Sequence, residues 1–255
     1  MKRYIIFLFL SYCAICYSQI DDLSRQKDIF FQDEFSFGLF FKTNGWGLDY
    51  RRGYFVNLNQ KNLMEINFNR IKHPKEYKQE SYYKLFSKYV YGKLNEVYDF
   101  NIGLGRQFTI VDKREPGTIE MQIIAMIGTQ IALLKPIYYE IIVSSSPSYE
   151  TTYEKYKPAH QPGLIMGKAS YILGFNEISI NYGFYIKIGT SFEHSKKIKS
   201  LNSFEAGIKF DYFIKTLTIM AETPNYKFVP SLYISYRIGK IIKTSNRKEK
   251  DKQIN

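Results

Sequence analysis

The feature that most constrains this chain is a two-residue alternation of apolar and polar side chains. From Ile178 to Ile188 every even position is Ile, Tyr or Phe, and the odd positions between them are Ser, Asn, Gly, Tyr and Lys. Residues Phe204 to Tyr212 repeat the pattern, with Glu, Gly, Lys and Asp at the intervening positions. Because successive side chains of a strand point to opposite faces, each segment predicts a β-strand with one apolar and one polar face.

Six further segments follow the same rule, so the sequence predicts eight strands. Their lengths are close to the roughly 9–11 residues that a tilted strand needs to cross a bilayer. The mean hydropathy is only −0.30, but alternation hides the apolar face from such an average. The predicted strands are 35–42, 46–51, 64–69, 98–105, 119–133, 178–188, 204–212 and 228–237.

The size of the apolar side chains decides which face points inward. An eight-stranded barrel has an interior just wide enough for side chains or one small ligand. The apolar face carries mostly large residues, in a chain with 23 Tyr and 20 Phe, whereas the polar face is rich in Gly, Ser and Asn. We therefore expect the apolar face to point outward to lipid, in an all-β, eight-stranded antiparallel transmembrane β-barrel. Closure would also pair every backbone group, as a bilayer requires.

The predicted connections alternate in length, as expected for a barrel with long extracellular loops and short periplasmic turns. Residues 70–96 and 136–176 are long, whereas 113–117 and 194–200 are short. The connection after the first strand departs from this rule, because Asn44-Gly45 is a tight-hairpin signal. Within the longest connection, the apolar pieces 137–143 and 164–173 suggest either strands that continue above the membrane or a docking surface for protein.

The N-terminus is typical of a cleavable signal peptide. Lys2 and Arg3 precede a short apolar run, and small residues at Cys16 and Ser18 predict cleavage before Gln19. An uncleaved anchor and a buried N-terminal strand are the alternatives. Both cysteines lie in this segment, so the mature chain would have neither a disulfide framework nor a cysteine-ligated metal site. The predicted divisions are a signal peptide (1–18), a periplasmic lead-in (19–33), the barrel (34–240) and a basic disordered tail (241–255).

These features resemble the eight-stranded outer-membrane barrels of the OmpA/OmpX type. The resemblance rests on the signal segment, the alternations at 178–188 and 204–212, and the terminal strand at 228–238. The sequence Phe35-Ser36-Phe37-Gly38-Leu39, together with a Gln after a Ser cleavage site, is similar to outer-membrane barrels of Bacteroidota. The resemblance implies location in the outer membrane. One departure is the tail that follows Ile238, since such barrels often end at an aromatic residue.

The predicted register places many charged side chains inside the barrel. Buried charges persist only when they are paired and hydrogen-bonded. We therefore expect a salt-bridge network that plugs the barrel, rather than a narrow ion path. The predicted network comprises Lys42, Asp49, Arg51, Glu65, Asp99, Glu177, Lys187, Glu205, Lys209, Asp211 and Arg237.

The sequence favours a structural or interaction protein over an enzyme. No motif indicates a nucleophile, a metal site or a cofactor, and His73 and His160 fall in predicted outer loops. The basic and aromatic loop 70–96 suggests contact with lipopolysaccharide phosphates rather than nucleic acid. We expect an accessory subunit of a secretion, uptake or barrel-assembly machine, bound to other outer-membrane or periplasmic proteins. An outer-membrane enzyme, or a small-solute conduit with a site at the extracellular rim, is the alternative.

Overall fold

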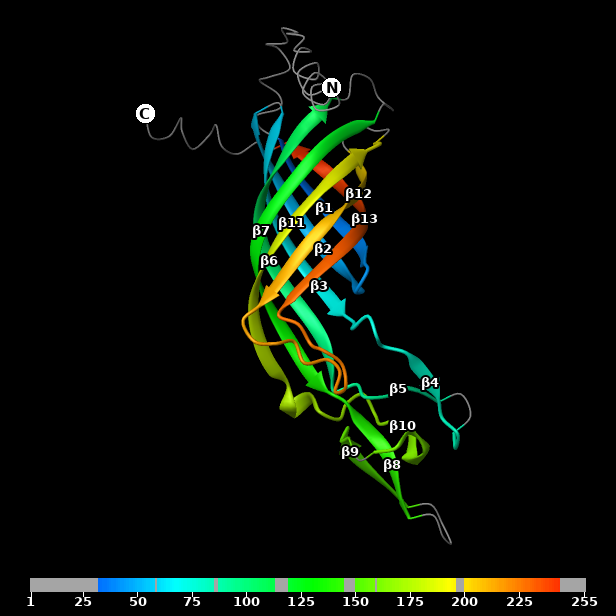
Figure 1. Ribbon diagram of the computed structural model, residues 1–255. Helices are drawn as coiled ribbons and strands as arrows, with labels where there is room; N and C mark the ends of the chain where they lie inside the picture. Colours follow the sequence, from blue (N-terminus) through cyan, green and yellow to red (C-terminus); the bar gives the residue numbers. More distant parts are fainter. Residues whose placement is uncertain are drawn as a thin grey trace, which may run out of the picture.

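Eight strands close into one antiparallel barrel (Figure 1). The computed structural model describes residues 32–243, except 58, 85–86, 113–118, 145–149, 159 and 196–199. The predicted all-β, eight-stranded antiparallel fold is confirmed. The barrel strands are β1 (Gln32–Lys42), β2 (Gly45–Asn57), β3 (Gln60–Ile71), β6 (Asn95–Val111), β7 (Glu120–Pro136), β11 (Ser179–Glu193), β12 (Ser200–Phe213) and β13 (Phe228–Lys243).

The barrel strands form a simple meander in which each pairs with the next barrel strand along the chain. The first and last strands close the ring, from Gln32 opposite Lys243 to Lys42 opposite Tyr233. The predicted signal peptide 1–18 and residues 244–255 of the predicted tail lie outside the described residues.

The alternation of the sequence becomes an alternation between the outside and the inside of the barrel. On β11 the side chains of Tyr182 and Phe184 are 56% and 55% exposed, whereas Tyr185 and Lys187 are buried. The other barrel strands follow the same pattern, with large apolar side chains outside. Most inward-facing side chains are small, polar or charged, and a few buried aromatic rings such as that of Tyr185 fill the narrow interior between them.

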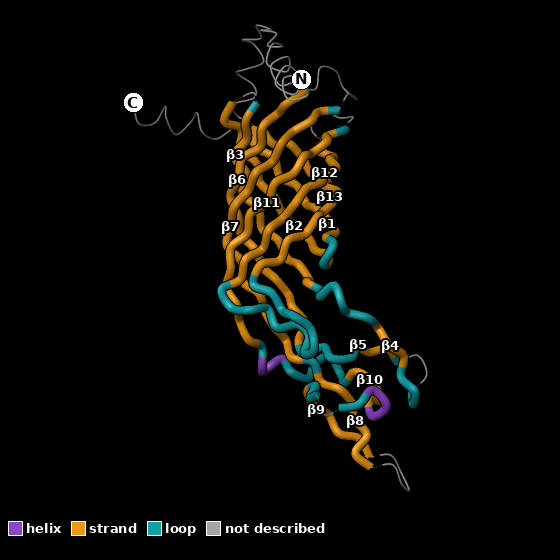
Figure 2. Tube along the Cα trace, viewed as in Figure 1, coloured by secondary structure: helices purple, strands orange, loops and turns teal. Residues whose placement is uncertain are grey.

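The connections differ between the two ends of the barrel. Residues 72–94, 137–178 and 214–227 all leave one end, which we call the loop end (Figure 2). At the opposite end, the turn end, β1 begins and β13 ends. The two ends of the barrel therefore differ, and most of the described non-barrel chain belongs to the loop end.

The three long connections fold into a small substructure, the loop head (72–94, 137–178 and 214–227). It contains the pair β4 (Lys78–Glu80) and β5 (Lys88–Val90). It also contains a three-stranded sheet of β8 (Tyr138–Ser144), β9 (Glu150–Lys155) and β10 (Ile165–Lys168). The described helices are the two 3-10 turns η1 (Pro162–Leu164) and η2 (Phe175–Glu177). No helix in the described part of the chain is long and apolar enough to cross a membrane.

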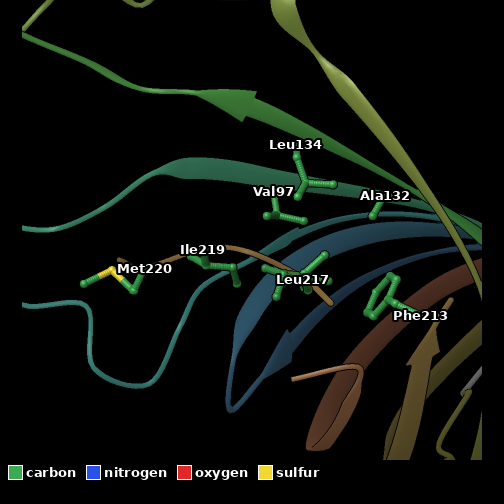
Figure 3. Packing of buried hydrophobic residues seen from close by; sticks show 8 residues of the cluster. Val97, Ala132, Leu134, Phe213, Leu217, Ile219 and Met220 are labelled. Carbon is green, nitrogen blue, oxygen red and sulfur yellow. The ribbon is translucent and has the colours of Figure 1, made fainter. Parts of the chain in front are cut away.

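A hydrophobic cluster joins the loop head to the barrel (Figure 3). Four barrel strands supply inward-facing side chains, and residues 217–220 fold down onto them. We call this cluster the apolar cap. Its members are Ile71, Val97, Ala132, Leu134, Phe213, Leu217, Ile219 and Met220.

Candidate functional site

The middle of the barrel interior holds a cluster of six charged side chains. Arg51 donates to Glu65 at 2.7 Å and to Glu205 at 2.8 Å. Lys187 lies 3.0 Å from Glu65 and 3.2 Å from Glu205. These residues come from β2, β3, β11 and β12, so the ion pairs cross the interior.

The remaining two members of this central cluster are Arg237 and Asp49. The guanidinium of Arg237 pairs with Asp49 at 2.5 Å and lies 3.6 Å from Glu65. The hydroxyl of Tyr233 donates to Glu205 at 2.8 Å. The central cluster thus has three cations and three carboxylates, all nearly inaccessible to solvent.

A second charged cluster lies closer to the loop end. Lys209 contacts Asp211 at 2.8 Å and Asp99 at 3.8 Å, while Lys42 lies 3.6 Å from Asp211. This cluster has two cations and two carboxylates. The interior network is therefore charge-balanced in each cluster, which is what burial demands of ionised side chains.

Additional layers close both ends of the interior. Towards the turn end, Lys61 pairs with Glu34 at 2.8 Å and Gln107 donates to Gln122 at 2.6 Å. At the loop end, the apolar cap covers the second charged cluster. Along its axis, the barrel interior therefore passes through a polar layer, two charged layers and an apolar layer.

Ten of the eleven residues predicted for the network lie buried in the barrel interior. The prediction is wrong for Glu177, which is exposed in η2 and accepts a hydrogen bond from Tyr138 at 2.6 Å. The error in the prediction comes from the strand boundary. Strand β11 begins only at Ser179, so the alternation does not extend back to Glu177.

Sequence reasoning missed several interior residues. Lys61 and Glu34 lay just outside the predicted strand limits, although each continues the inward-facing parity of its strand. Tyr185 lies on the polar face of its strand, and its ring lies 4.5 Å from the ammonium of Lys209. The ring of Tyr233 similarly lies 4.8 Å from the ammonium of Lys187.

The base of the loop head contains a basic cleft with a volume of about 270 Å³. Its most buried cation, Lys93, pairs with Glu76 at 2.6 Å. Burial lowers the pKa of Lys93, and Glu76 opposes that shift. Glu96 binds Lys168 at 2.6 Å. The charged residues that line the basic cleft are Arg70, Lys72, Lys78, Lys88, Lys93, Lys168, Glu76 and Glu96.

The histidines make local contacts in the loop head and at the turn end. Nδ1 of His73 accepts from the Lys75 amide at 3.2 Å, so Nε2 carries the proton and donates to the Pro224 carbonyl. His160 lies 3.5 Å from Glu154 and packs edge-on against Tyr156. His194 lies near the ring of Tyr236. The described residues contain no group of three or more potential metal ligands.

Closure, eight antiparallel strands and an outward apolar face together define the architecture. The fold is that of the small outer-membrane barrels. No family model matches the sequence, and no curated protein matches it. The resemblance to barrels of Bacteroidota stays a prediction.

Several solved structures are similar to this chain. Neisserial surface protein A is 10% identical, with 83% of this chain and 96% of that chain covered and a TM-score of 0.35. Ail of Yersinia pestis, in complex with the heparin analogue sucrose octasulfate, is 7% identical, with 83% and 97% covered and a TM-score of 0.39. The N-terminal β-barrel domain of Pseudomonas aeruginosa OprF is 8% identical, with 83% and 98% covered and a TM-score of 0.33.

Proposed function

We propose that this protein is a closed-lumen barrel of the bacterial outer membrane and an accessory subunit of a larger outer-membrane assembly. The observation that carries the proposal is the balanced, capped interior combined with a folded loop head. If no ion or solute passes through the interior, the protein acts through contacts between its surface and other molecules. The predicted signal peptide supplies the route of export.

The outer surface supports the membrane location. Side chains such as Phe37, Leu104 and Leu232 are about 60% exposed on three different strands. Burying apolar area in lipid recovers about 25 cal/mol per Å², whereas in water a belt of this extent would drive aggregation. Loops are long on the extracellular side of such barrels, so we place the loop head outside the cell.

The layered interior supports the closed lumen. An ion that entered from the loop end would meet the apolar cap and then ion pairs whose charges are already satisfied. Eight strands leave no room for a water-filled channel beside these side chains. We therefore interpret the interior network as a stiffening plug, and the conduit alternative receives no support from it.

The basic cleft supports an anionic contact for the loop head. Six cations and two carboxylates line it, so a net positive charge remains after Glu76 and Glu96 are paired. Lipopolysaccharide phosphates lie at the level of such a rim, and they are the anions that we propose it contacts. The exposed aromatic side chains of Tyr77 and Tyr82 would add contact area for a protein partner.

The decisive experiment is affinity purification of the tagged protein from outer membranes in mild detergent, with mass spectrometry of the proteins that follow. We expect a stoichiometric partner set that is lost when Tyr77 and Tyr82 are both changed to Glu. Changing Arg106 and Lys240, both exposed near the turn end, to Glu is the matched control and should retain the partners. Recovery of the wild-type protein alone would contradict the accessory role.

The closed lumen is tested separately by electrical recording across a planar lipid bilayer. We expect no steps in current from the inserted wild-type protein. The expectation also holds when 214–227 is replaced by a two-residue turn, since the charged layers lie below the apolar cap. Regular open states in the wild type would refute the plug and favour the conduit.

The alternative function, a site at the rim, is favoured by one observation. His73 lines a pocket at the loop end, beside Asn44 and Lys72. If this rim were catalytic, replacing His73 by Ala would abolish the activity, whereas His160→Ala would leave it unchanged.

A further inference from the structure

The outer surface of the barrel changes from apolar to charged where β3, β6 and β7 approach the loop end. On β3, the outward-facing Phe68 is followed on the same face by Arg70, which lies opposite Tyr98 of β6. The next outward pair towards the loop end is Glu96 of β6 opposite Lys135 of β7. Charged side chains are costly in the hydrocarbon core of a bilayer, so this boundary marks the level of the lipid headgroups.

An apolar groove of about 210 Å³ lies on this outer face, on the membrane side of the charged side chains. Side chains of β3, β6 and β7 contribute to it, and η2 packs against β7 beside it. The groove opens on the outside of the barrel, so acyl chains of the surrounding bilayer reach it directly. Its apolar lining comprises Phe68, Tyr98, Leu133, Tyr171, Phe175 and Ile178.

The charged side chains beside the groove carry more positive than negative charge. Glu96 is the one carboxylate of the described residues that pairs with them, and its Oε1 lies 2.6 Å from Lys168 and 3.3 Å from Arg70. Lys135 has no ion pair among the described residues, and its ammonium lies 4.4 Å from the centre of the Tyr171 ring. Three cations around one carboxylate leave a surplus of two positive charges.

Two of these cations are open to an occupant from outside. The side chains of Arg70 and Lys168 are 30% and 33% exposed, although both contact Glu96. Lys135 is covered by aromatic rings and adds its charge to the local field. The Tyr171 ring lies 5.4 Å from the Lys168 ammonium and also lines the groove, so the cations and the groove are adjacent. A matching ligand has an anionic group next to an apolar chain.

The geometry points to a binding site for a phosphorylated membrane lipid, with one acyl chain in the groove and its phosphate against Arg70 and Lys168. We call this the lipid site. The guanidinium of an arginine matches the oxygens of a phosphate, and a phosphate monoester carries up to two negative charges, which equals the surplus. The inference rests on the proposed membrane location and extracellular loop head, and it does not require a protein partner.

The test measures fluorescence quenching by brominated lipids, with the full-length protein reconstituted in phosphatidylcholine vesicles. The reporter is Phe175→Trp in a Trp46→Phe background, so that the single tryptophan of the chain lies at the groove. Brominated phosphatidic acid supplies the phosphate monoester, and brominated phosphatidylcholine is the comparison lipid. Because the surplus cations attract an anionic headgroup, we expect phosphatidic acid to quench the reporter at a mole fraction at least about tenfold lower.

A second reporter on the far side of the barrel is the matched control. Phe41→Trp in the same background lies near the loop end of β1, which is opposite β7 in the ring of strands. Phe41 is exposed on the outer surface, and its cross-strand neighbours, Trp46 and Ile234, are uncharged. We expect the two brominated lipids to quench this reporter equally at equal mole fractions.

Two pairs of substitutions identify the cations. Lys135→Gln with Lys168→Gln removes the surplus charge, and we expect the Phe175→Trp reporter to lose its preference for phosphatidic acid. Lys84→Gln with Lys157→Gln is the matched control, because it removes the same charge from exposed positions of the loop head that do not line the groove. The preference should remain in that variant. Heat-dependent migration on detergent gels establishes that each variant is folded.

Three outcomes would overturn the lipid site. The first is equal quenching of the Phe175→Trp reporter by both brominated lipids. The second is an equal loss of preference in both pairs of substitutions, which would indicate attraction by the loop head as a whole. The third is loss of the preference when inorganic phosphate is added, which would indicate an anion site that holds no acyl chain.

Failure of the lipid site is distinguishable from failure of the proposed function. If neither brominated lipid quenched the Phe41→Trp reporter, the membrane location itself would be wrong, and the lipid site with it. Recovery of the protein without partners would contradict the accessory role and leave the quenching results unchanged. If the variant with both Lys135→Gln and Lys168→Gln does not fold, Lys168→Gln alone should still lower the preference for phosphatidic acid, and an unchanged preference would contradict the lipid site.

Discussion

At the scale of single residues, the interior of this barrel depends on ionic partners that are supplied by distant parts of the chain. Glu65 is fully buried and contacts Arg51, Lys187 and Arg237, which lie on three other strands. An isolated buried charge would be strongly unfavourable. The contribution of each charged residue to stability therefore depends on its neighbours. Removing one of them leaves the opposite charges around it buried without a partner.

We predict that Glu65→Ala lowers the free energy of unfolding by about 3–5 kcal/mol, because it leaves buried cations without their carboxylate. The measurement is reversible denaturant unfolding in lipid vesicles. Asp33→Ala is the control, since its ion pair with Arg52 is partly exposed and should contribute about 0–1 kcal/mol. Equal losses for the two variants would show that the interior ion pairs have no special role.

At the scale of elements, the connection between β12 and β13 is held by the hydrogen bonds of a single side chain. The side chain of Asn225 binds the amides of Ile219 and Met220 at 2.8 and 3.2 Å. Its amide nitrogen donates to the carbonyls of Met220 and Thr223. The Asn225 side chain thus fixes the turn that places residues 217–220 of the apolar cap against the barrel strands.

We predict that Asn225→Ala destabilises this connection by about 1–3 kcal/mol, because two buried amides lose their acceptor. Amide hydrogen exchange should become faster in residues 216–225, while the barrel strands keep their protection. Lys227→Ala is the matched control, since that side chain is exposed in the same connection. Faster exchange across the whole barrel would contradict a local role for Asn225.

At the scale of the whole molecule, the arrangement inverts that of a water-soluble protein, with charge inside and large apolar side chains outside. Ile186 lies on this outer surface near the middle of β11, and Ile242 lies near the end of β13; each is about half exposed. In a bilayer these two positions differ in depth, whereas in water they would be equivalent.

We predict that Ile186→Arg lowers the free energy of unfolding by about 2–4 kcal/mol, because the charge lies near the bilayer midplane. Ile242→Arg, near the interface, should cost about 0–1 kcal/mol. Both values come from unfolding titrations in vesicles of defined thickness. A protein that did not span a bilayer would show no dependence on depth.

Local alternation along the chain determined most of the barrel. A period of two at 178–188 and 204–212 requires strands, and the size of the apolar side chains requires that they point outward. The same parity placed ten of the eleven predicted network residues inside. It gave the wrong position for Glu177 because alternation alone does not mark where a strand begins.

Other features depended on the tertiary structure, since they join residues that have no fixed spacing in the sequence. The pairing of Arg51 with Glu205 depends on which strands face each other across the interior. The pocket beside the Thr43–Asn44 turn is lined by three separate parts of the chain, 43–44, 71–74 and 217–230. Strand periodicity is a property of neighbours along the chain, and it therefore shows in the sequence. Pockets and ion pairs are properties of neighbours in space, and only the closed barrel brings those residues together.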